Sequence, residues 1–160
     1  MVPVARFRQR VGDPCLADNH TRMKNLLIAS LLLAATTTAQ TYTVTNFGTP
    51  CGATLQGQVM TTPAGSAIHL GVTGAHPGAL AFLVIGHPQA APVPLPGSPC
   101  FLLVDPRLVL HTVTTATGSA RFGFRIPPVL PITIDFQAVI ARHTTHLVAE
   151  STNGVRLHGV

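Results

Sequence analysis

Apolar and polar residues alternate with a period of two along much of the chain after residue 40. The alternation is regular in three segments, 67–73, 120–126 and 132–140, where apolar side chains take every second position. Such alternation is typical of strands that bury one face of a sheet. A fourth segment, 79–85, reads ALAFLVI and is apolar throughout. This continuous run predicts a central strand that is covered on both faces.

Further segments are rich in β-branched or apolar residues and lie between turn-forming residues, so we expect strands there as well. These segments are 53–61, 101–104, 108–115, 145–151 and 155–158. Asn153-Gly154 stands between the last two, and this dipeptide is typical of a two-residue hairpin turn. Segment 86–99 carries five prolines. Because proline cannot donate to a β-ladder, we expect this segment to leave the sheet as one long loop.

The number and spacing of these segments predict an all-β domain with no credible helix after residue 40. An antiparallel β-sandwich of about eight to nine strands is the expected fold, and a β-barrel is the alternative. Charged residues make up only 9% of the chain. This scarcity also argues against long surface helices, because such helices carry charged residues on their wet face. Residues 40–160 suffice for one domain and not for two.

Residues 23–39, MKNLLIASLLLAATTTA, have the three-part layout of a secretory signal peptide. Lys24 precedes an apolar run, and small residues follow as far as Ala39. We expect a signal helix over 23–39 and cleavage between Ala39 and Gln40. The apolar run is about half as long as a membrane span, which makes an uncleaved anchor the weaker alternative. Residues 1–22 are then a mis-assigned upstream start or a disordered extension, with a long basic leader region as the alternative.

The signal places the mature domain outside the cytoplasm, either secreted or in the cell envelope, in the periplasm or on the outer surface. Thiols tend to oxidise there, and Cys51 and Cys100 are the two cysteines after residue 40. We expect a disulfide between them. The closed loop of about fifty residues gives roughly 4 kcal/mol of stabilisation in the chain-entropy model. Two cysteines without a CxxC spacing or a nearby paired histidine do not form a structural zinc site.

Charge and motifs exclude several classes of function. Residues 40–160 contain five arginines, no lysine and three carboxylates, a net charge of +2. No basic cluster remains to neutralise phosphates, so we expect no nucleic-acid partner. The carboxylates Asp105, Asp135 and Glu150 are far apart in the sequence, and we expect Asp135 to pair across strands with Arg121 or Arg125. Without a nucleophile motif, a phosphate loop or a dinucleotide fingerprint, we expect neither an enzyme nor a cofactor.

Several short stretches resemble a group of uncharacterised bacterial secreted β-sandwich modules, which often stand at the C-terminus of larger surface or extracellular proteins. The stretches are GTPCG at 48–52, IHLGVTGAHPGA at 68–79, PCFLLVDP at 99–106, TATGSA at 115–120 and DFQAV at 135–139. The resemblance covers nearly all of residues 48–158 and includes a turn of the Ser-Asn-Gly type at 151–154. It implies a sandwich fold and an extracellular address, and it implies no catalytic residue.

The remaining candidates for a site are histidines and one arginine in predicted loops. His143 and His146 would point to opposite faces of a strand, which is wrong for a shared metal, so we expect no metal site. We take His76, His87 and Arg142 as candidate ligand-facing residues. The chain has no Trp and one Tyr, so it has few aromatic side chains that could stack against a sugar ring.

The expected function is a non-catalytic structural or protein-interaction role on a sheet edge or the proline-rich loop, with an unknown protein or cell-envelope partner and no stable membrane span after cleavage. A small-ligand or carbohydrate-binding module is the alternative.

Overall fold

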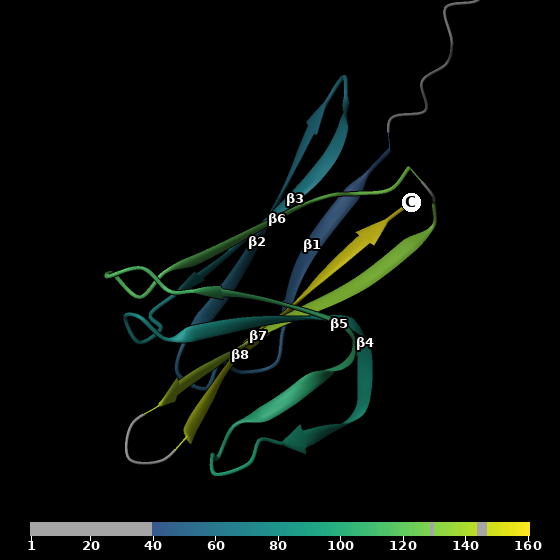
Figure 1. Ribbon diagram of the computed structural model, residues 1–160. Coiled ribbons are helices and arrows are strands. Elements are labelled where there is room, and N and C mark those ends of the chain that lie inside the picture. The colour runs from purple at the N-terminus through teal and green to yellow at the C-terminus, as the bar shows by residue number, and fades with distance from the viewer. Residues whose placement is uncertain (1–39, 129, 144–146) are drawn as a thin grey trace, which may run out of the picture. The chain divides into compact units, whose positions relative to one another are not determined.

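Two antiparallel sheets pack face to face in the computed structural model, which describes residues 40–128, 130–143 and 147–160 (Figure 1). The five-stranded sheet has the order β1 (Tyr42–Phe47), β8 (Leu147–Gly159), β7 (Ile132–His143), β4 (Leu80–Pro94) and β5 (Phe101–Val113). The three-stranded sheet has the order β2 (Thr54–Thr62), β3 (Gly65–Thr73) and β6 (Ala120–Arg125). The expected all-β sandwich is confirmed, while the expected signal helix at 23–39 lies outside the described residues.

The core lies between the sheets and is built from the alternating apolar positions. Leu55 of β2, three residues of β3 and Ala120 of β6 point inward from the smaller sheet, and Leu83, Phe136 and Leu157 meet them from the larger one. The rings of Phe124 and Phe136 stack across the interface, with centroids 6.3 Å apart. The period-two pattern therefore identified the buried faces of β3, β6 and β7, because burial on one side is what produces the alternation.

The proline-rich segment is not a long loop, and this expectation was wrong. β4 continues as far as Pro94 and β5 begins at Phe101, so the two strands form one hairpin that includes the segments expected as separate strands at 101–104 and 108–115. The hairpin formed by β4 and β5 bends sharply (Figure 1). Gly86 pairs with Pro106 at a register shift in its ladder. A Cβ atom at Gly86 would overlap the carbonyl oxygen of Asp105, so only glycine allows the strands to approach this closely.

The bend carries the outer half of the hairpin away from the plane of the sheet. We call residues 87–104 the folded arm. Val104 and Cys100 of the folded arm are buried, and the arm makes hydrogen bonds to β7 on the outer face of the larger sheet. The sandwich therefore gains a partial third layer at this place. Proline is tolerated in this part of the hairpin because irregular pairing leaves several positions without a ladder bond.

The expected hairpin turn at Asn153-Gly154 is also wrong, because β8 runs without interruption through both residues. The Asn153 side chain is buried and faces the other sheet. Its Oδ1 accepts a hydrogen bond from Leu55 N at 2.9 Å, and its Nδ2 donates to Leu55 O at 3.0 Å. Asn153 thus serves as a strand partner for β2 and fastens the two sheets together. Strand β1, which no pattern indicated, pairs with the other edge of β8.

Candidate functional site

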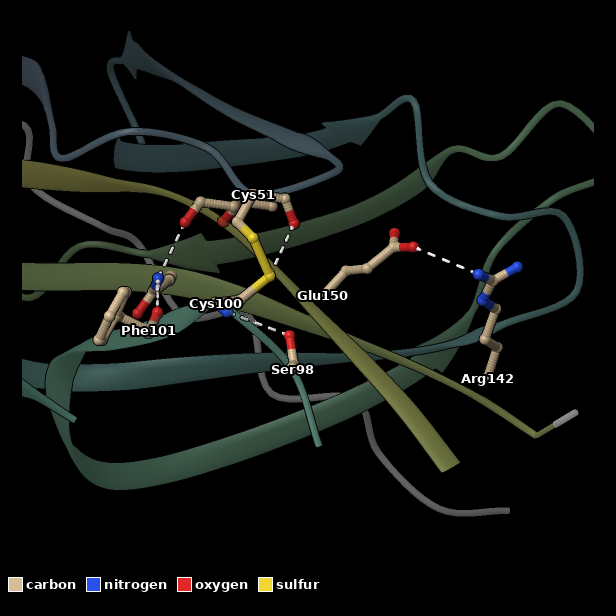
Figure 2. Close-up of a disulfide and its surroundings, with 8 residues drawn as sticks. Cys51, Ser98, Cys100, Phe101, Arg142 and Glu150 are labelled. Atoms are coloured by element: carbon tan, nitrogen blue, oxygen red, sulfur yellow. Dashed lines mark hydrogen bonds and ion pairs between the residues drawn. A yellow bond between two sulfur atoms is a disulfide. The ribbon is translucent and has the colours of Figure 1, made fainter. Parts of the chain in front are cut away.

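The predicted disulfide between Cys51 and Cys100 is present and fastens the folded arm to the segment between β1 and β2 (Figure 2). Cys51 also pairs through its backbone with Ser151 of β8, with N–O distances of 2.7 and 3.1 Å. The Cys100 amide donates to the Ser98 hydroxyl at the tip of the arm. The disulfide therefore joins the arm to a point that is itself held by the larger sheet.

Gln137 of β7 holds the base of the same arm. The residue is fully buried, and its Oε1 accepts a hydrogen bond from Leu103 N at 2.7 Å. Its Nε2 donates to Phe101 O and to Thr152 O at 3.0 and 2.9 Å. Replacing a buried amide with this many partners is expected to lower the free energy of unfolding, because each lost hydrogen bond leaves a backbone group unpaired. These contacts assign the arm a structural role.

Asp135 is buried completely, and its partner is Arg156 of β8 instead of Arg121 or Arg125, so that expectation was wrong. The guanidinium donates through Nε to Oδ1 at 2.8 Å and through Nη2 to Oδ2 at 2.9 Å. Hydrogen bonding to Asp135 raises the pKa of Arg156 above its ordinary value. Arg156 also lies over the ring of Phe47, 5.3 Å from its centroid. The two parallel hydrogen bonds keep this buried carboxylate paired with a guanidinium group.

Two of the three candidate loop residues come together. His76, from the connection between β3 and β4, and Arg142 of β7 line one hollow with residues 77–80 and Ala141. Arg142 also faces Glu150, with 3.9 Å between Nη2 and Oε1 (Figure 2), while its buried Nε has no hydrogen-bond partner among the described residues. The carboxylate of Glu150 partly neutralises the charge of Arg142. The hollow would therefore attract an anion only weakly.

The other predicted residues lie elsewhere. His87 is exposed on the folded arm, where it lies opposite Asp105 in the ladder between β4 and β5. It does not line the hollow that contains His76. Gln40 accepts a hydrogen bond from the Tyr42 hydroxyl at 2.9 Å. Ala39, the other side of the expected cleavage site, is outside the described residues, as are His146 and the side chain of His143. Over residues 40–128, 130–143 and 147–160, no group of three or more metal-ligating side chains comes together.

A second concave surface lies on the outer face of the three-stranded sheet, and the sequence analysis did not find it. The strand register places three rows of residues across this face. The rows are Gln56, Gly71 and Arg121; Gln58, His69 and Gly123; and Met60, Ala67 and Arg125. We call these nine residues the trough. A hollow of about 560 Å³ lies over one end of the trough. A second hollow of about 700 Å³ shares Met60 and His69 with the first and extends past Arg125 to residues outside the trough at 62–66 and 126–128.

The two walls of the trough differ in chemistry, and the exposed His69 lies between them on the floor strand. The β2 wall presents the amides of Gln56 and Gln58, and the β6 wall presents the guanidinium groups of Arg121 and Arg125. The floor is β3, where Gly71 has open space at the position of a Cβ atom. Alternating polar positions on β2 and β6 were visible in the sequence. Only the pairing of the strands brings them to one surface.

The positive charge of the domain is concentrated on this surface. Each of the three carboxylates forms an ion pair with an arginine elsewhere, in the pairs Asp105–Arg107, Asp135–Arg156 and Glu150–Arg142. Residues 40–160 contain five arginines and no lysine. The two remaining arginines are Arg121 and Arg125, and neither forms an ion pair with any described residue. The net charge of +2 is therefore carried by one wall of the trough.

No helix within the described ranges is long and apolar enough to span a membrane. Comparison of the chain with known proteins found no matching family model, no matching curated protein and no matching solved structure.

Proposed function

We propose that this chain is a non-catalytic binding module that acts outside the cytoplasm, and that the trough is its binding surface. The observation that supports this role is the composition of the trough, in which hydrogen-bonding and cationic side chains border a floor formed by Ala67, His69 and Gly71. Ligand sites commonly combine such a concave surface with a few polar groups. The ion-paired state of the three carboxylates fits a module without acid–base chemistry.

Filling the trough tests this role. Gly71→Tyr places a large side chain on the floor, where a Cβ atom meets no heavy atom within 4 Å. We expect the variant to fold, because an aromatic residue suits a strand better than glycine does. The probes are polygalacturonate, its methyl-esterified form, dextran, chitin oligomers and poly-L-glutamate, immobilised on a sensor surface. We expect the wild-type protein to bind at least one of them, and Gly71→Tyr to lose at least about tenfold in affinity, or about 1.4 kcal/mol.

Thr43→Tyr is the matched control, since Thr43 is exposed on β1 of the other sheet. This variant adds a tyrosine of the same size away from the trough, and we expect it to bind like the wild type. The proposal would be contradicted if Gly71→Tyr bound every probe as the wild type does, or if the wild type bound none of them.

The proposed location has its own test. Intact-mass analysis of the protein recovered from outside producing cells is expected to give an N-terminus at Gln40. We also expect a mass about 2 Da below that of the dithiol form, as one disulfide requires. The disulfide between Cys51 and Cys100 supports an oxidising compartment. A product that starts at Met1 with free thiols would rule out export by the segment 23–39.

A protein-contact role is the second candidate, and a separate observation favours it. Val109 and Val113, four residues apart on β5, are 47% and 57% exposed, which is high for apolar residues on one strand. This surface lies on the larger sheet, whereas the trough lies on the smaller one. This role would be favoured over the trough if Val109→Lys lost binding to a protein partner while Gly71→Tyr bound that partner as the wild type does.

A further inference from the structure

We propose that the ligand of the trough is an acidic polysaccharide, a carboxylate-bearing sugar chain that lies along β3. This inference rests on the proposed binding role and adds the chemical class of the ligand. Its basis is the separation of functional groups on the two walls, with neutral amides on β2 and unpaired guanidinium groups on β6.

The dimensions of the trough fit one extended chain. Its walls are two strand spacings apart, about 10 Å, which leaves room for a single polymer strand between them. Arg121 and Arg125 are four residues apart on β6, a separation of about 13 Å along the strand. The two hollows adjoin through Met60 and His69, and both are open to solvent. A linear ligand can therefore lie across both of them.

The charge of the trough favours an anionic ligand. Arginine binds carboxylate groups through two parallel hydrogen bonds, and neither Arg121 nor Arg125 has a carboxylate partner among the described residues. No Asp or Glu lines either hollow. An acidic ligand therefore meets no repulsion along the trough and supplies the counter-charge that the arginines lack within the chain.

The polar groups favour a sugar chain over an acidic peptide. Strand backbones within a sheet are already paired, so an added peptide finds its backbone partners at an edge rather than on a face. The amides of Gln56 and Gln58 each donate and accept, which matches the hydroxyl groups of a sugar. No Trp or Tyr lines the hollows, so the stacking on which neutral sugars depend is missing. Carboxylate recognition takes its place.

Two ligands and two trough variants test the proposal on the full secreted protein. The ligands are polygalacturonate and its methyl-esterified form, which share a backbone and differ in charge. The variants are Arg121→Gln and Arg125→Gln. Arg107→Gln is the control, because it removes one positive charge from β5, away from the trough. We expect affinity electrophoresis to show binding to polygalacturonate alone, weakened about fivefold to tenfold by either trough variant. Arg107→Gln should change the affinity less than about twofold.

The remaining outcomes separate this proposal from the binding role itself. If Gly71→Tyr abolishes binding to a neutral polymer while Arg121→Gln and Arg125→Gln have no effect, the trough binds ligands and the acidic class is wrong. If poly-L-glutamate binds as tightly as polygalacturonate, the sugar assignment is wrong. If Arg107→Gln weakens binding as much as the trough variants do, the affinity reflects net charge and the site is overturned. If neither polygalacturonate nor its methyl-esterified form binds, the proposal also fails.

Discussion

Replacing both disulfide cysteines, in Cys51→Ala with Cys100→Ala, is expected to lower the free energy of unfolding by about 4 kcal/mol. The disulfide closes a loop over a sequence separation of 49 residues, and removing it restores the chain entropy of the unfolded state. Urea unfolding followed by circular dichroism measures the loss. We also expect faster hydrogen exchange at Leu103 N, because the folded arm then depends on Gln137 for its attachment.

The wild-type protein under reducing conditions provides the control, since it should lose the same free energy without any substitution. The effect is expected to be strongest in the folded arm. A loss below about 1 kcal/mol in the double variant would contradict the view that this crosslink is a main source of stability. Unchanged exchange at Leu103 would show that Gln137 alone holds the arm.

Asn153→Leu is expected to lower the free energy of unfolding by about 2 to 6 kcal/mol. Leucine has a similar length but no amide, so the N–H and C=O of Leu55 lose their side-chain partner in the buried interface. Each unsatisfied buried group costs about 1–3 kcal/mol. The measurement is again the free energy of unfolding in urea, compared with that of the wild type at the same pH.

Asn46→Leu is the matched control for this second prediction, because Asn46 is exposed on β1 and the chemical change is identical. We expect its free energy of unfolding to stay within about 0.5 kcal/mol of the wild type. A similar loss in the two variants would mean that the amide of Asn153 makes no special contribution, and that the sheets are held together by apolar packing alone.

The strands were predictable where one face is buried and the other is wet. Segments 67–73 and 132–140 fall within β3 and β7, and segment 120–126 extends one residue past the end of β6. The agreement is close because the alternation reflects burial directly. The disulfide was predictable from the cysteine count. The folded arm was not, since prolines are read as strand breakers and the irregular pairing that tolerates them arises only from the tertiary fold.

Asn153-Gly154 was misread for a related reason. The dipeptide carries a strong local preference for a tight turn, yet here the amide is used to bond β2 of the opposite sheet, and a long-range contact outweighs the local signal. Gly154 has a separate reason to be glycine, because a Cβ atom there would overlap the ring of Phe47. Local propensity describes what a segment prefers alone, and partners far away in the sequence decide the outcome.

The trough was hidden because its members are scattered along the sequence. Gln56, Gly71 and Arg121 lie in one row although 65 positions separate the first from the last. On each strand alone, these residues look like an ordinary wet face. The charge distribution was equally hidden. Residues 40–160 have a net charge of +2, and only the pairing of three arginines with three carboxylates shows that this charge lies on β6.

The kink where Gly86 meets Pro106 also affects how copies of this protein meet one another. A straight outer strand offers a continuous row of backbone donors and acceptors, along which a neighbouring molecule can extend the sheet without limit. Here that row on β5 loses a donor at Pro106 and turns out of plane. The geometry that folds the hairpin over its own sheet therefore also makes β5 a poor template for a strand added by another molecule.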